Sequence, residues 1–120
     1  IALPLDKVAS FYAEARERVS AIVPDAPIST VAHLGDGNLH FIVSLGDKYA
    51  DRHDEVMSLV EDVVLDYGGS FSAEHGIGLS KIPSMQRRKD PVAVATMRAI
   101  KNAIDPSDMM NPGKVIPPQD

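Results

Sequence analysis

The chain has 120 residues, of which 44% are hydrophobic and 24% are charged, a composition typical of a globular domain. Its net charge of -5 argues against nucleic acid as the main partner, because nucleic-acid binding favours a basic surface. The absence of cysteine excludes disulfides, cysteine-ligated zinc and thiol nucleophiles. Because the first residue is Ile rather than Met, we expect a piece of a longer protein.

Apolar periodicity and turn residues divide the chain into elements. In chain order they are a helix over 5–22 capped by Asp6, strands over 28–34 and 39–45, a helix over 51–67 ended by Gly68, a short strand over 70–74, a helix from Pro91 to 104, and a tail over 105–120. Three strands beside helices indicate an α+β fold. We expect an antiparallel sheet with a central β-hairpin packed against helices, a partial ferredoxin-like domain that needs another strand before residue 5.

The hairpin carries two histidines on either side of its turn. Asp36 and Gly37 suit the two central positions of a type I′ turn, since both positions need φ > 0. That turn would pair His33 directly with His40, with Cβ atoms about 4.5–5.5 Å apart on one face. The opposite face, with Ala32, Leu34, Leu39, Phe41 and Val43, is predicted to pack on the helices.

Two imidazoles close together can share a metal ion, and Glu74 can add a carboxylate. Two histidines and one carboxylate are a common ligand set for catalytic zinc and also suit Fe(II). His75 is a candidate general base, since glycines after it allow the chain to turn. The alternative is that these four residues are ordinary polar surface residues.

Three motifs occur in order: residues 33–40 (HLGDGNLH), residues 72–78 (SAEHGIG), and Asp105-Pro106 followed by Asn111-Pro112-Gly113-Lys114. Together they resemble the C-terminal domain of FAD-linked oxidases of the vanillyl-alcohol-oxidase type. Members of this group act on D-2-hydroxy acids such as lactate, glycolate and 2-hydroxyglutarate. The resemblance covers about residues 28–116.

The resemblance implies a cap domain, with the FAD-binding domain missing from these residues. It implies that His33, His40 and Glu74 bind a divalent metal, usually zinc, that orients the substrate. It makes His75 the base that accepts the hydroxyl proton while hydride passes from C2 to FAD. It also suggests these contacts: Asn38 with substrate, and Asn111 and Lys114 with cofactor.

The identity of the acid stays open, because Ile42 stands where some hydroxyglutarate-type members carry asparagine. Expected partners are the 2-hydroxy acid, the FAD-binding domain and a second copy of the chain, since an open sheet edge favours pairing. We expect a cytoplasmic enzyme, attached to a membrane only through other parts of a longer polypeptide. Two alternatives remain: a metal enzyme complete in this chain, and a non-catalytic oligomerising domain.

Overall fold

The computed structural model describes residues 1–33 and 35–118, so Leu34 and its predicted packing role lie outside the described residues. The chain divides into two compact units, Ile1–Glu74 and His75–Asp120. Among the helices described, none combines the length and the apolar character that a membrane-spanning segment requires.

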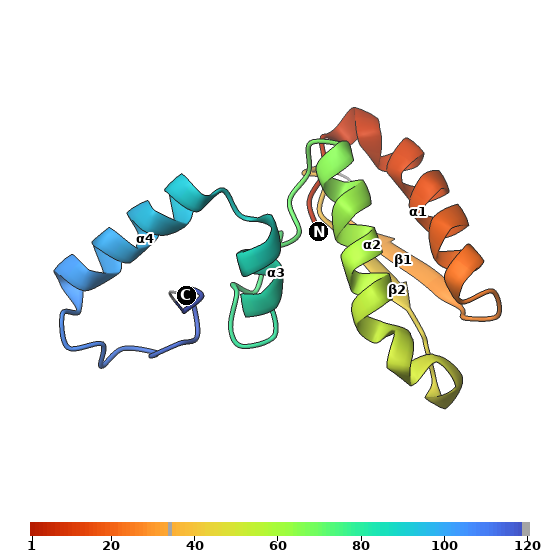
Figure 1. Cartoon of the computed structure of the whole chain (residues 1–120). Coiled ribbons are helices and arrows are strands. Elements are labelled where there is room, and N and C mark those ends of the chain that lie inside the picture. Colours follow the sequence, from red (N-terminus) through yellow and green to blue (C-terminus); the bar gives the residue numbers. More distant parts are fainter. Residues whose placement is uncertain (34, 119–120) are drawn as a thin grey trace. The chain divides into compact units, whose positions relative to one another are not determined.

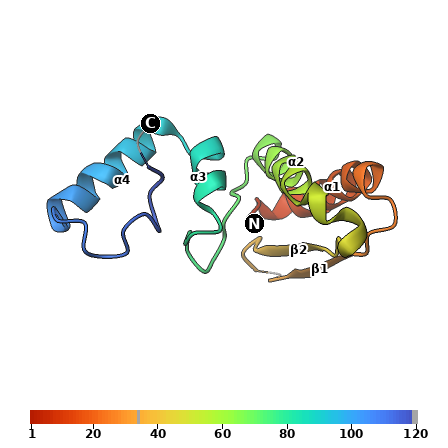
Figure 2. The ribbon, with the colours of Figure 1, turned by 60° about the horizontal axis from the view of Figure 1, so that its bottom comes forward.

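The first unit is a two-layer arrangement of helices on a β-hairpin. Two helices, α1 (Val8–Ile22) and α2 (His53–Asp66), lie on the same face of a hairpin formed by β1 (Ile28–Ala32) and β2 (Leu39–Val43) (Figures 1 and 2). Its core consists of Leu3, Phe11, Ala15, Val19, Val23, Leu39, Val56, Val60, Val63 and Val64. The predicted α+β class with a hairpin packed on helices is confirmed.

Both helices of this unit begin later than predicted. Residues Leu5–Lys7 form a 3₁₀ turn before α1, and Asp47–Arg52 form another before α2. The predicted cap at Asp6 is wrong: Lys7 is the N-cap of α1 and makes no side-chain capping bond, and Asp6 forms an ion pair with Lys7 at 3.3 Å. The predicted end of α2 is confirmed, because Gly68 (φ 70°) donates its N–H to the carbonyl of Leu65.

The hairpin has a register different from the predicted one. Val31 pairs with His40 and Ala32 with Leu39, and the N–H of His33 donates to the carbonyl of Asn38 at 2.9 Å. The shift of two residues arises because the loop is longer than a two-residue turn: Gly37 has φ 73°, whereas Asp36 is not in the left-handed region. His33 and His40 are therefore diagonal neighbours, still on one face because a two-residue shift preserves the side-chain alternation.

A third extended segment lies beside the hairpin, and it comes from the start of the chain. Ala2 forms antiparallel bridges with Asn38 on one side and with Ser70 on the other. The predicted strand over 70–74 is wrong, because only Ser70 pairs. The hydroxyl of Ser70 donates to the carbonyl of Ser72 and accepts from its N–H, a local turn that competes with a strand ladder.

The second unit contains two helices and an irregular tail. The predicted third helix is confirmed as α4 (Pro91–Ile104), with Asp90 as its N-cap accepting from the N–H of Ala93 at 2.9 Å. A short helix, α3 (Ile82–Arg88), was not predicted, because seven residues are too few to display a periodic apolar stripe. No residue of α4 is buried, so this helix contributes no buried residue to a core of its own unit.

Candidate metal centre

The hairpin presents one face to the helices and leaves the other open. Leu39, which is 2% exposed, points into the core. Alternation then places His40 and Ile42 on the open face, together with Val31, the cross-strand neighbour of His40. His33 follows β1 directly and shares this face.

Three predicted metal ligands meet on the open face. The Nε2 atom of His40 lies 2.9 Å from Oε1 of Glu74, and the ring centroids of the two histidines are 6.0 Å apart. One ligand atom from each of His33, His40 and Glu74 lies within 4.8 Å of the other two. The structure thus brings together the three residues that the sequence singled out as a ligand set.

The donor set fits a divalent transition metal. Zinc binds nitrogen and oxygen ligands at about 2.0–2.2 Å, so ligand atoms of a tetrahedral site lie roughly 3.3 Å apart. The observed separations, 2.9 Å for the His40–Glu74 pair and at most 4.8 Å within the set, lie on either side of this value. Three protein ligands leave a fourth position for a substrate or water.

Glu74 reaches the histidines through the N-terminal segment. Ala2 lies between Asn38 and Ser70, bonded to Ser70 through both of its backbone groups at 2.9 Å and 2.8 Å. Ser70 is thereby separated from the hairpin only by the extended segment at Ala2. Residues 71–74 lead from Ser70 to Glu74, whose carboxylate lies beside His40. No local pattern in the sequence indicates this arrangement, because the first three residues show no strand periodicity.

The side chain of His33 has polar neighbours at its Nδ1 atom. Its Nδ1 atom lies 3.5 Å from Nδ2 of Asn38 and 3.9 Å from Oδ2 of Asp36. Asn38 is only 8% exposed, and its backbone N–H donates to Oδ1 of Asp36 at 2.9 Å. A metal-ligating histidine usually donates its other N–H to an acceptor. Asp36 offers a carboxylate oxygen for this, whereas Asn38 turns its amide nitrogen, a donor, towards Nδ1 and accepts only after its amide rotates by half a turn. With that rotation, Asn38 and Asp36 are placed to orient His33.

The remaining predicted site residues belong to the second unit. His75, its first residue, has a left-handed backbone with φ 66°, and Gly76 follows with φ 72°. Non-glycine residues rarely adopt this conformation and often do so at functional sites. Whether His75 acts as a base stays a prediction.

Asn111 and Lys114 are the two ends of a tight turn. The N–H of Lys114 donates to the carbonyl of Asn111 at 3.1 Å, and Gly113 has φ 67°. Pro112 followed by a glycine with positive φ is the pattern of a type II turn. The turn accounts for the local sequence, and the predicted cofactor contacts of both residues stay predictions.

Asp105, which the sequence analysis placed in the third motif without a role, is a structural residue at the end of α4. Its side chain forms an ion pair with Lys101 and accepts the N–H groups of Met110 and Met109 at 2.8 Å and 3.0 Å. The Lys101 ammonium and then the Met110 N–H lower the pKa of Asp105 from 3.8 to about 2. Asp105 therefore ties the tail to the last turn of α4.

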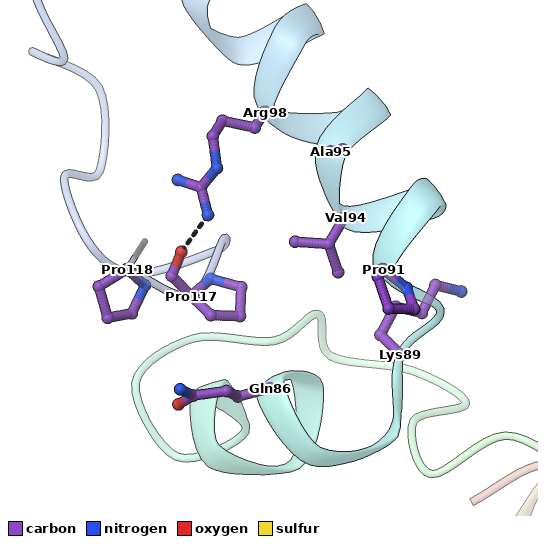
Figure 3. Close-up of a pocket in the computed structure, with 8 residues that line it drawn as sticks. All are labelled: Gln86, Lys89, Pro91, Val94, Ala95, Arg98, Pro117 and Pro118. Atoms are coloured by element: carbon purple, nitrogen blue, oxygen red, sulfur yellow. Dashed lines mark hydrogen bonds between the residues drawn. The ribbon is translucent and has the colours of Figure 1, made fainter. Parts of the chain in front are cut away.

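A groove of about 400 Å³ lies between α4 and the tail (Figure 3). It is lined by Gln86, Lys89, Pro91, Val94, Ala95, Arg98, Pro117 and Pro118. Arg98 donates to the carbonyl of Pro117 at 2.5 Å, as Figure 3 shows. The residues predicted to act in chemistry lie elsewhere in the described chain.

Comparison with known proteins gives one family for nearly the whole chain. Residues 1–115 match the model of the C-terminal domain of FAD linked oxidases. A D-2-hydroxyglutarate dehydrogenase of Stutzerimonas stutzeri is 34% identical over 96% of this chain and 26% of its own length. The mitochondrial D-2-hydroxyglutarate dehydrogenase of Arabidopsis thaliana is 35% identical over 98% of this chain and 20% of its own length.

A mitochondrial D-lactate dehydrogenase of the cytochrome type from Arabidopsis thaliana is also similar, with 31% identity over 98% of this chain and 21% of its length. The chain thus spans between a fifth and about a quarter of these curated relatives. The family predicted from the three motifs is confirmed: the chain belongs to the FAD-linked oxidases, as their C-terminal domain.

Proposed function

We propose that this chain is the substrate-orienting part of a flavin-dependent dehydrogenase or oxidase that converts a D-2-hydroxy acid into the 2-oxo acid. The convergence of His33, His40 and Glu74 within 4.8 Å carries the proposal, and its relatives support it, since their names place them among D-2-hydroxyglutarate and D-lactate dehydrogenases. The acid is of the lactate, glycolate or 2-hydroxyglutarate type.

In this proposal His33, His40 and Glu74 hold zinc or another divalent metal. When bound, the metal supplies positive charge that neutralises the substrate carboxylate and makes the hydroxyl more acidic. The open face of the hairpin admits the substrate, because neither α1 nor α2 covers it. Asn38 and Asp36 hold the ring of His33 in its ligating orientation, and Asn38 is also a candidate substrate contact.

His75 accepts the hydroxyl proton while the C2–H bond breaks and two electrons leave with the hydride. FAD, held mainly by another part of a longer polypeptide, supplies the acceptor for that hydride. The products are the 2-oxo acid, reduced flavin and protonated His75. In this scheme Asn111 and Lys114 contact the cofactor or the domain that binds it, and the enzyme works in the cytoplasm.

Metal analysis of a His40→Ala variant tests the site. The parent chain, stripped of metal and reloaded with zinc, should retain about one ion per chain, and His40→Ala should lose most of it, because its imidazole is one of three ligands. His53→Ala is the matched control, since His53 is exposed and pairs with Asp54 away from the cluster. Equal zinc content in the parent and in His40→Ala would refute the assignment.

A further inference from the structure

Two large aliphatic side chains stand exposed beside the metal ligands. Val31 is 59% exposed and Ile42 is 46% exposed, although both belong to strands of the first unit. The register makes Val31 the direct cross-strand partner of His40. Ile42 follows His40 by two residues on the same strand, so His40 has one aliphatic neighbour across the ladder and one along its own strand, all on one face.

The open face bears no cationic side chain from either strand. β1 reads ISTVA and β2 reads LHFIV, with neither lysine nor arginine. A carboxylate pressed against Val31 and Ile42 would lose its water without gaining a charged partner there, which is unfavourable. An alkyl group in the same place would be removed from water and stabilised.

A 2-hydroxy acid that binds a metal through its carboxylate and hydroxyl has a single further carbon substituent, at C2. The ligand cluster is flanked by Val31 and Ile42, so the substituent of an acid bound there falls beside aliphatic surface. We infer that Val31 and Ile42 form the side-chain subsite and that the substrate is a monocarboxylic 2-hydroxy acid with a short alkyl substituent, rather than a dicarboxylic acid. This inference rests on the proposed function, because it requires the acid to bind at the metal.

Equilibrium binding to the zinc-loaded chain tests the inference without catalysis. The ligands are D-lactate, D-2-hydroxybutyrate and D-2-hydroxyvalerate, which differ only by methylene groups, and D-2-hydroxyglutarate, which replaces the last methyl of hydroxyvalerate with a carboxylate. Methyl resonances of Val31 and Ile42, and ring resonances of His40, report the contacts. We expect each added methylene to tighten binding by about fourfold, with shifts at both methyl-bearing residues.

The variants are Val31→Thr and Ile42→Thr, which keep a β-branched side chain and hence the strand. In the double variant we expect the gain per methylene to vanish and the preference for hydroxyvalerate over hydroxyglutarate to fall about tenfold. Taking this preference as a ratio between variant and parent cancels the intrinsic affinity of zinc for each acid. Leu65→Gln is the control, since Leu65 is an exposed aliphatic residue on α2.

Three results overturn the inference. The first is that the parent chain binds lactate, hydroxybutyrate and hydroxyvalerate with equal affinity. The second is that the ring resonances of His40 shift on binding while the methyl resonances of Val31 and Ile42 do not. The third is that the double variant prefers hydroxyvalerate over hydroxyglutarate as strongly as the parent does. Each leaves the proposed function standing. Failure of the parent to hold zinc, read separately from metal content, would overturn both.

Discussion

At the scale of single residues, the site depends on the polar groups behind its ligands. Asn38 is nearly buried and faces the Nδ1 atom of His33, while its backbone fixes both the carboxylate of Asp36 and the N–H of His33. The low exposure of Asn38 therefore favours a role in positioning His33 over a role as a direct substrate contact. A residue with this role affects metal affinity without being a ligand.

Replacing Asn38 with alanine should weaken zinc binding by about 10–100-fold, the usual cost of losing an outer partner of a ligating histidine. Saturating zinc should still bind one ion per chain, because the three ligands remain. Competition titration against a chelator of known affinity measures the change. Ser29→Ala, on the same face of β1, is the control; an affinity equal to that of the parent would remove Asn38 from this role.

Asp105 should make the join between α4 and the tail sensitive to strong acid. Its carboxyl pKa lies below the ordinary value in the folded chain, mainly because of Lys101. The carboxylate therefore stabilises the fold fully above about pH 3.8, and this stabilisation is lost as the pH falls towards about 2. Amide shifts of Met109 and Met110 followed against pH should show a transition near pH 2.

A Lys101→Ala variant should move that transition up, towards the ordinary carboxyl range, because the largest cause of the lowered pKa is gone. In Asp105→Asn the transition should be absent. The same midpoint in the parent and in Lys101→Ala would contradict the ion-pair explanation.

At the scale of elements, the close approach of the N-terminal segment to the hairpin loop determines the geometry of the site. The N–H of Leu3 donates to the carbonyl of Gly37 at 3.0 Å, and the Leu39 N–H donates to the carbonyl of Ile1 at 2.9 Å. A Cβ atom on Gly37 would lie 1.9 Å from the carbonyl oxygen of Leu3. Gly37 is therefore required by both its φ and its neighbour, and this contact helps to hold the segment that leads to Ser70 and Glu74.

Gly37→Ala should lower the free energy of unfolding by at least about 1–3 kcal/mol, because alanine is strained at φ 73° and its methyl group collides with Leu3. Urea denaturation measures the loss. Gly35→Ala is a matched control in the same loop, because nothing lies within 4 Å of its Cβ position. If both variants unfold at the same urea concentration, the close approach has no energetic role.

At the scale of the whole molecule, the two units differ in what they bury. The first unit has a continuous core between two helices and a hairpin. In the second unit α4 leaves Ile100 and Ile104 exposed, an apolar side typical of a surface that another part of a protein covers. The difference supports our proposal that this chain acts within a longer flavin-binding polypeptide; the predicted self-association stays a prediction, to be checked by analytical ultracentrifugation.

The zinc-loaded chain alone should not oxidise D-2-hydroxy acids in the presence of an artificial electron acceptor, because the proposed hydride acceptor is absent. Turnover by the isolated chain would favour the alternative of a metal enzyme complete in itself. In a flavin-containing polypeptide that includes this chain, His75→Ala should lower kcat by about 10²–10⁴-fold with the metal retained. Unchanged turnover would remove His75 from the mechanism.

The sequence by itself determined α1, α2 and α4, the hairpin, the shared face of His33 and His40, and the family. These follow from local periodicity, turn residues and motif order, all of which act over short stretches of chain. Tertiary structure decided the register, because the loop that includes Asp36 is closed against Leu3 rather than by a two-residue turn. It also decided how Glu74 joins the histidines, because Ser70 is held by Ala2, a partner 68 positions away whose pairing has no local signature.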